Sequence, residues 1–222
     1  RHLQDAVTLA RAIDQSEHLT FAGLQAYHGG AQHIREHTKR RAAIMSAADK
    51  VRATKAALDS SGISCFKVTG AGTGSFEFEG ETGAWDEFQC GSYAFMDADY
   101  GRNLLEDGKN FTTFEQSLFV LATVMSQPED GLAVIDAGLK AIAVDSGYAV
   151  PHDLPDVEYV DASDEHGKLT LGSGTPPLSV GDKIRLVPGH CDPTVNLHDW
   201  YVCVRDGVVE NVWPIAARGA VF

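Results

Sequence analysis

The chain has 222 residues and a formal net charge of −13, and 44% of its residues are hydrophobic. This length fits one large domain or two small ones, and the hydrophobic share is sufficient for a buried core. So acidic a chain is a poor partner for nucleic acid or an anionic membrane surface, because both require a basic face. No run of eighteen or more apolar residues occurs, so no membrane-spanning segment is expected.

The cysteines bear on the cellular compartment. Cys65, Cys90, Cys191 and Cys203 are spaced like neither a zinc motif nor a small disulfide scaffold. No secretory signal opens the chain. We therefore expect reduced thiols in a cytoplasmic protein.

The first hundred residues alternate between helical and strand patterns. Residues 3–17 carry apolar side chains close to helical spacing, and residues 19–27 form a mostly apolar run typical of a strand. A long helix with one apolar stripe is expected over 31–60, and a second short strand over 63–70. The order helix, strand, helix, strand predicts an α/β unit with parallel strands.

The character of the sequence changes after residue 101. Many short β-rich runs follow, separated by Gly, Asp, Ser and Pro, which is typical of an antiparallel β domain. The run "VRDGVVE" predicts a hairpin that turns at Asp206 and Gly207. We expect two domains, 1–105 and 106–222.

Two glycine-containing stretches are candidates for binding an anion. In "VTGAGTGS" (68–75) a strand runs into a glycine-rich loop, whose backbone N–H groups can surround a phosphate. Its position after a parallel strand favours this interpretation, because ligand sites of α/β proteins lie at such ends. Gly91 and Ser92 in "QCGSYAFMD" could supply a second set of donors. The alternatives are a flexible turn and a tight turn before a buried strand.

The stretch "GLQAYHGG" (23–30) places Gln25 and Tyr27 two residues apart, on one face of a strand. His28 points to the other face or into the following loop. It is a candidate general base, and the alternative is a structural histidine.

The stretch "PGHCDPTVNLHDW" (188–200) concentrates groups that bind metals. His190 and Asp192 are separated by two positions, which in an extended segment puts both on one side, and Pro193 favours extended geometry for Asp192. A histidine nitrogen with a carboxylate oxygen suits Mn²⁺, Mg²⁺ or Zn²⁺, and two protein ligands leave positions open for water and substrate. The alternative is a polar turn between strands. The candidates for supporting groups are Asn196, His198 and Asp199.

Together these motifs resemble a known family. With "VIDAGLKA" and "VWPIAARG", they are similar to the fold-type III pyridoxal phosphate (PLP) enzymes: D-threonine aldolase, 3-hydroxy-D-aspartate aldolase and D-serine dehydratase. The resemblance covers residues 19 to 219, and "QCGSYAFMDADYGR" and "RLVPGHCDPT" are most similar to 3-hydroxy-D-aspartate aldolase. It implies the last part of an alanine-racemase-like (β/α)8 barrel in 1–105, followed by a mostly antiparallel β domain in 106–222.

The resemblance also implies cofactors and their ligands. His190 and Asp192 would bind a divalent metal, Mn²⁺ or Mg²⁺ rather than zinc, because the family pairs Asp with aldolases and Cys with zinc-dependent dehydratases. The residues expected to hold PLP are Gln25, Tyr27, Thr69, Gly72, Thr73, Gly91 and Ser92.

The function implied by the resemblance is retro-aldol cleavage of D-3-hydroxy amino acids. The products would be glycine and glyoxylate from 3-hydroxy-D-aspartate, or glycine and acetaldehyde from D-threonine. His28 is a candidate base, and a homodimer is expected. Two alternatives are a D-serine or 3-hydroxyaspartate dehydratase and a PLP-binding protein without catalytic activity.

One feature departs from the family pattern. The family carries its Schiff-base lysine on the first barrel strand, and no lysine of this chain lies in such a motif. Arg1 is followed directly by a helical pattern. We expect the chain to be the C-terminal portion of a longer enzyme, with the Schiff-base lysine outside it.

Overall fold

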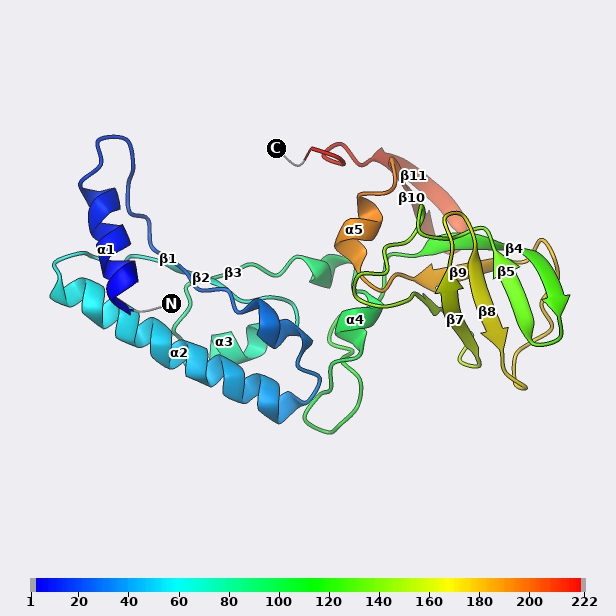
Figure 1. The fold of residues 1–222 in the computed structure, drawn as a ribbon, viewed down its shortest axis with the longest axis horizontal. Helices are drawn as coiled ribbons and strands as arrows, with labels where there is room; N and C mark the ends of the chain where they lie inside the picture. Colours follow the sequence, from blue (N-terminus) through cyan, green and yellow to red (C-terminus); the bar gives the residue numbers. More distant parts are fainter. Residues whose placement is uncertain (1–2, 221–222) are drawn as a thin grey trace. The chain divides into compact units, whose positions relative to one another are not determined.

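The computed structural model describes residues 3–220, which form two compact units (Figure 1). The first unit runs to Tyr93 and includes Arg102–Phe111. The second unit combines Ala94–Gly101 with the residues from Thr112 onward. The division thus differs from a single boundary at residue 105.

The segment 94–101 belongs to the second unit because its backbone is paired there. The N–H groups of Ala98 and Asp99 donate to the carbonyls of Pro188 (2.9 Å) and Gly189 (3.1 Å). These hydrogen bonds join residues about ninety positions apart, and no local sequence pattern predicts them.

The first unit is built around a short parallel sheet in the order β1-β2-β3. Its longest helix, α2, is drawn in cyan in Figure 1. In chain order the elements are α1 (Leu3–Asp14), β1 (Leu24–Gln25), η1 (Gly29–His33), α2 (His37–Ser60), β2 (Val68–Gly70), α3 (Phe76–Thr82) and β3 (Glu87–Phe88), and η2 (Ser92–Ala94) follows.

Several elements are shorter than the sequence predicts, among them the strand expected over 63–70, which is reduced to Val68–Gly70. The helix expected over 31–60 begins at His37, because residues 29–33 form the 3-10 helix η1. The strand expected over 19–27 is reduced to Leu24–Gln25, because its ladder partner β2 has three residues and pairs with those two positions alone. The long helix ends at Ser60, and Gly62 follows it with a φ of +75°, which favours glycine.

The apolar stripe of α2 packs on the sheet as predicted. Ile44, Ala48 and Val51 are buried at helical spacing and contact Val68 of β2 and Phe78 of α3. Burial of such side chains is the main stabilising contribution of this unit.

The second unit is an antiparallel six-stranded sheet in the order β6-β9-β4-β5-β8-β7. The edge strands β6 and β7 contact each other, so the sheet is barrel-like. Its core contains Val124, Ile135, Leu169, Ile184 and Leu186. The strands are β4 (Val120–Glu129), β5 (Leu132–Ile135), β6 (Val150–Pro151), β7 (Val157–Ala162), β8 (Gly167–Leu171) and β9 (Lys183–Val187).

The unit also contains two short helices and a hairpin. The helices are α4 (Ala98–Gly101) and α5 (Cys191–Val195), and the hairpin joins β10 (Trp200–Arg205) to β11 (Val208–Pro214). Asp206 (φ +50°) and Gly207 (φ +76°) occupy its turn, which confirms the predicted Asp-Gly hairpin. Among the helices of residues 3–220, none has the length and apolar character needed to cross a bilayer.

Candidate functional site

The carboxyl ends of the parallel strands carry a row of polar side chains. Gln25 pairs with Thr69 in the register of β1 and β2, and the Thr69 hydroxyl donates to the Gln25 side-chain oxygen. The Gln25 amide nitrogen donates in turn to Gln89 Oε1 at 2.5 Å. Gln25 and Thr69 therefore lie together, and Gln89, the first residue of the stretch "QCGSYAFMD", is bonded to Gln25 although it was not among the predicted site residues.

The two predicted glycine-containing turns also lie together. Thr73 Oγ1 accepts a hydrogen bond from the N–H of Tyr93 at 3.0 Å, which ties the 71–75 loop to the turn at Gly91 and Ser92. Thr73 and Ser92 are both buried. Within residues 3–220 the N–H groups of Gly72, Thr73, Gly91 and Ser92 donate no hydrogen bond to another residue. Such amides beside buried hydroxyls match the donor set that a phosphate requires.

Gln32 supports this loop and was not predicted from the sequence. It is buried, its Oε1 accepts from the N–H of Gly74 at 3.0 Å, and its Nε2 donates to Ser75 Oγ at 2.6 Å. The Ser75 hydroxyl donates onward to Glu79 Oε1 at 2.9 Å. The network fixes the loop from its buried side. Gln32 follows two glycines at the start of η1, where no pattern distinguishes it from a solvent-exposed glutamine.

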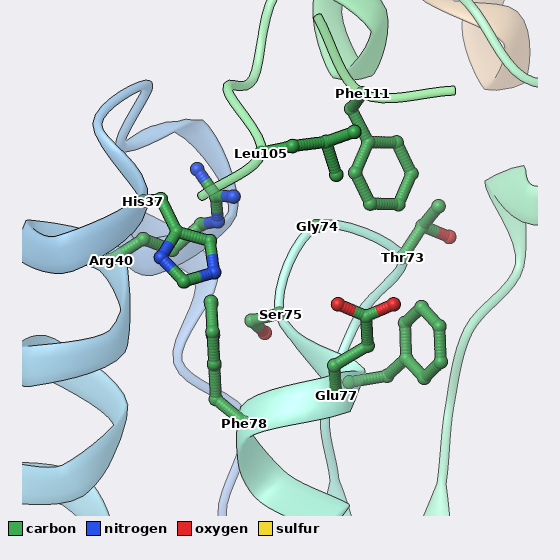
Figure 2. A pocket seen from close by; sticks show the side chains of 10 residues that line it. His37, Arg40, Thr73, Gly74, Ser75, Glu77, Phe78, Leu105 and Phe111 are labelled. Atoms are coloured by element: carbon green, nitrogen blue, oxygen red, sulfur yellow. The ribbon is translucent and has the colours of Figure 1, made fainter. Parts of the chain in front are cut away.

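Figure 2 shows a small pocket, and Thr73, Gly74 and Ser75 of this loop contribute to its wall. Arg40 of α2 is buried there, with its guanidinium 5.6 Å from the centre of the Phe78 ring. Its nitrogens donate to the carbonyls of Ile34, Arg35 and Leu104 at 2.6, 2.9 and 2.8 Å. Arg40 therefore anchors the chain around the loop through Nη1 and Nη2, whereas its Nε is buried and has no hydrogen-bond partner among residues 3–220.

Glu79 gives the network a pH dependence. Burial raises the pKa of its carboxyl, with an opposing contribution from the Ser75 hydrogen bond, and Oε2 has no hydrogen-bond partner among residues 3–220. A carboxyl whose pKa is raised by folding contributes stability below its unfolded pKa of about 4.3 and loses it as the pH rises through the folded value.

We expect Glu79→Gln to become more stable relative to the unaltered protein as the pH rises from 4 to 8, because the variant carries no charge to bury. Urea unfolding of both proteins across this range measures the difference. Glu77→Gln, two residues away in α3 and exposed, is the control and should show a flat difference. A flat difference for Glu79→Gln as well would mean that its carboxyl ionises without cost in the folded state.

The remaining predicted residues of the first unit have separate positions. The Tyr27 hydroxyl lies beside Gly72, 2.6 Å from where a Cβ on that glycine would be. His28 is exposed and precedes η1, with its carbonyl accepting from the N–H of Ala31. Within residues 3–220 no interaction joins the His28 ring to another candidate side chain, so its role as a base stays a prediction.

The predicted metal pair lies at the start of α5. His190 precedes the helix in extended conformation, and Asp192 is in its first turn. His190 Nε2 is 3.6 Å from Asp192 Oδ2. Two ligands about 2.1 Å from one ion are about 3.0 to 3.4 Å apart at octahedral or tetrahedral angles. A small side-chain rotation brings the pair to that separation, so the donor set fits a divalent ion.

The backbone conformation at Asp192 differs from the one that the sequence predicts. Asp192 was expected to be extended because Pro193 follows it, and this is wrong, because Cys191–Val195 is helical. Proline is tolerated in the first turn of a helix, where its missing N–H would have no intrahelical partner. Cys191 is buried, and its N–H donates to Asp97 Oδ2 at 3.0 Å.

Asp145 is the functional residue that the sequence reasoning missed. Its Oδ2 is 2.7 Å from His190 Nδ1, although the two residues are 45 positions apart. Burial alone would lower the pKa of His190, but the Asp145 hydrogen bond and the charges of Asp145, Asp192 and Asp97 outweigh it and raise the pKa. Burial would raise the pKa of Asp145, and the interactions with His190 outweigh this and lower it.

The three residues that were expected to support His190 and Asp192 form their hydrogen bonds and ion pairs with other residues. His198 Nε2 is 2.8 Å from the carbonyl of Ala141. Asn196 Oδ1 accepts from the N–H of Gly219, and Asp199 pairs with Arg218 at 3.2 Å. In the described part of the chain no cluster of three or more His, Cys, Asp or Glu side chains has metal-binding geometry.

Known proteins resemble this chain over almost its whole length. A family model described as "Putative serine dehydratase domain" matches residues 117–204. The chain is 49% identical over 215 residues to the 3-hydroxy-D-aspartate aldolase of Paracoccus denitrificans (strain Pd 1222), covering 96% of this chain and 55% of that protein. The crystal structure of D-threonine aldolase from Filomicrobium marinum superimposes with a TM-score of 0.91 at 48% identity, covering 97% of this chain and 58% of that one.

The chain belongs to the D-threonine aldolase and 3-hydroxy-D-aspartate aldolase family. It corresponds to the C-terminal portion of these proteins and spans about 55% of the length of the aldolase it matches. An alanine-racemase-like protein from Idiomarina loihiensis matches with a TM-score of 0.75 at 21% identity, over 95% of this chain and 59% of that one. This likeness confirms the predicted alanine-racemase-like fold, a parallel α/β segment followed by an antiparallel β domain.

The lysines of this family member are consistent with roles at the surface. Lys39, Lys67, Lys140 and Lys168 each form an ion pair with an exposed carboxylate, at 2.6 to 2.9 Å. That the Schiff-base lysine lies outside this chain stays a prediction.

Proposed function

We propose that this chain supplies the phosphate cradle and the metal pair of an aldolase that cleaves D-3-hydroxy amino acids. The substrates would be 3-hydroxy-D-aspartate, giving glycine and glyoxylate, or D-threonine, giving glycine and acetaldehyde. The observation that carries the proposal is the pair of His190 and Asp192, with Nε2 and Oδ2 separated by 3.6 Å. An oxygen ligand at position 192 favours a hard ion such as Mn²⁺ or Mg²⁺.

In the first unit, the residues named above would bind PLP by its phosphate. The amides of Gly72, Gly91 and Ser92 and the hydroxyl of Thr73 would neutralise the phosphate charge through hydrogen bonds. Gln25, Tyr27 and Thr69 would line the adjacent face of the cofactor. Gln32 and Ser75 hold the loop in shape, so its donors need no reorganisation when the anion binds.

In the second unit, His190 and Asp192 would hold the ion. When bound, PLP supplies an electron sink for Cα–Cβ cleavage, and the divalent ion polarises the 3-hydroxyl group of the substrate. Asp192 is 71% exposed, so an ion held there would be accessible to a substrate oxygen. His28 is our candidate for removing the hydroxyl proton. We also propose that the complete enzyme is a homodimer, as the family resemblance implies.

A dehydratase is the second candidate, because the family model matched over 117–204 carries a dehydratase description. The two activities differ in their products. The complete natural polypeptide, supplied with PLP and Mn²⁺, should convert 3-hydroxy-D-aspartate or D-threonine to equimolar glycine and aldehyde. Ammonia and a keto acid would instead establish the dehydratase. Absence of both product pairs would favour a PLP-binding protein without catalytic activity.

A further inference from the structure

The ring of His190 has a carboxylate at each nitrogen. Asp145 Oδ2 is 2.7 Å from Nδ1, and Asp192 Oδ2 is 3.6 Å from Nε2. The two nitrogens of an imidazole point in diverging directions, so one ion cannot be bound by Nε2 and Asp145 together. Asp145 must therefore act on the ring from the side opposite to the ion.

We propose that Asp145 is the positioning residue of the metal site, which holds His190 in the tautomer with hydrogen on Nδ1 and directs the Nε2 lone pair at an ion shared with Asp192. This inference rests on the proposed function. A carboxylate that accepts the N–H of a metal-binding histidine fixes the orientation of the ring and makes the other nitrogen a stronger ligand. Hydrogen on Nε2 would block metal binding, and Asp145 disfavours it by requiring a donor at Nδ1.

The contact is built from both sides rather than being a chance approach of two surface side chains. Thr194 of α5 donates from Oγ1 to the carbonyl of His190 at 2.8 Å and accepts at the same atom from the N–H of Ala143 at 3.2 Å. One hydroxyl thus connects the histidine backbone to the segment that carries Asp145. Thr194 is buried, so water does not compete for these bonds.

A second contact fixes the same two segments. A Cβ on Gly189 would overlap the carbonyl oxygen of Gly147, so the residue before His190 packs directly on the residue two positions after Asp145. The Ser146 hydroxyl lies 3.1 Å from Asp145 Oδ2, where it donates to the carboxylate. The Asp145 carboxylate is therefore held in place by its own loop, as a positioning group must be.

The test measures Mn²⁺ binding to the complete, chelator-treated polypeptide from the electron paramagnetic resonance signal of free Mn²⁺, without an activity assay. Loss of such a supporting carboxylate weakens metal affinity by about 10- to 100-fold, so Asp145→Ala should lose that much. Asp145→Asn keeps an oxygen that accepts from Nδ1 and should lose less than Asp145→Ala. Asp153→Asn is the matched control, because Asp153 lies 3.2 Å from another histidine, His152, and its loss should leave Mn²⁺ affinity unchanged.

Three outcomes separate this inference from the proposed function. Weakened binding in Asp145→Ala, with a thermal unfolding midpoint in chelator equal to that of Asp153→Asn, supports the positioning role. If His190→Ala abolishes Mn²⁺ binding while Asp145→Ala and Asp145→Asn bind within twofold of the unaltered protein, the positioning role is wrong and the metal site stands. If His190→Ala binds Mn²⁺ normally, the proposed metal site fails, and the positioning role fails with it.

Discussion

Replacing Gly72 by valine should abolish retention of PLP. A Cβ at this position would lie 2.5 Å from Gln32 Oε1 and 2.6 Å from the Tyr27 hydroxyl, far inside van der Waals contact. Moving the Gln32 side chain away costs free energy, because it is buried and its Oε1 and Nε2 are hydrogen-bonded to Gly74 and Ser75. Overpacking costs about 1 to 3 kcal/mol, and displacement of Gln32 adds about 1 kcal/mol for each hydrogen bond it loses. We expect PLP affinity to fall by about 100-fold or more, so that gel-filtered protein retains none.

Gly91→Ala provides the matched control for this experiment. Gly91 belongs to the same predicted cradle, but a Cβ there would meet nothing within 4 Å, and its amide is kept. Bound PLP is measured from its absorbance after acid release from gel-filtered protein. If Gly72→Val retains as much PLP as Gly91→Ala does, the 71–75 loop is not the phosphate cradle.

Replacing Asp192 by alanine should remove the metal and the cleavage activity while leaving PLP bound. The side chain is 71% exposed and is not among the residues proposed to hold PLP, so folding and PLP content should be unchanged. Loss of one of only two protein ligands should weaken Mn²⁺ binding and reduce glycine formation by about 100-fold or more. Asp199→Ala is the control, because Asp199 has similar exposure, 68%, and belongs to the same stretch of sequence. Asp192→Cys should shift the preferred metal toward zinc, because thiolate is the softer ligand.

The Gly72 and Asp192 variants should each lose a different ligand. Gly72→Val should keep Mn²⁺ binding and lose PLP, whereas Asp192→Ala should keep PLP and lose Mn²⁺. A variant that loses both ligands would indicate a folding defect and would count against two separately built sites.

The local features of the fold were predictable because they depend on neighbouring residues. The glycine-rich loop after a strand, the apolar stripe of the long helix and the hairpin at Asp206 and Gly207 each have a pattern within a few positions. Element ends were less predictable, as the late start of α2 at His37 demonstrates. A strand in a parallel sheet extends only as far as its partner, and the partner's length lies elsewhere in the chain.

The supporting residues of the two sites could not be predicted. Asp145 meets His190 across 45 positions, and Gln32 meets Ser75 across 43. Aspartate and glutamine are most often surface residues, and neither the polar surroundings of Gln32 nor the apolar run 141–144 before Asp145 marks a site. Only tertiary structure gives them their roles, whereas the residues proposed to touch the ligands are concentrated in short motifs.

We expect carbon–carbon cleavage to require a divalent ion on His190 and Asp192. Removing the ion from the complete polypeptide with a chelator, and then measuring glycine and aldehyde formation, tests this requirement. We expect no cleavage in the metal-free protein, with bound PLP unchanged, and recovery of cleavage when Mn²⁺ or Mg²⁺ is added back. Full cleavage activity without bound metal would contradict the account and would mean that His190 and Asp192 serve the structure alone.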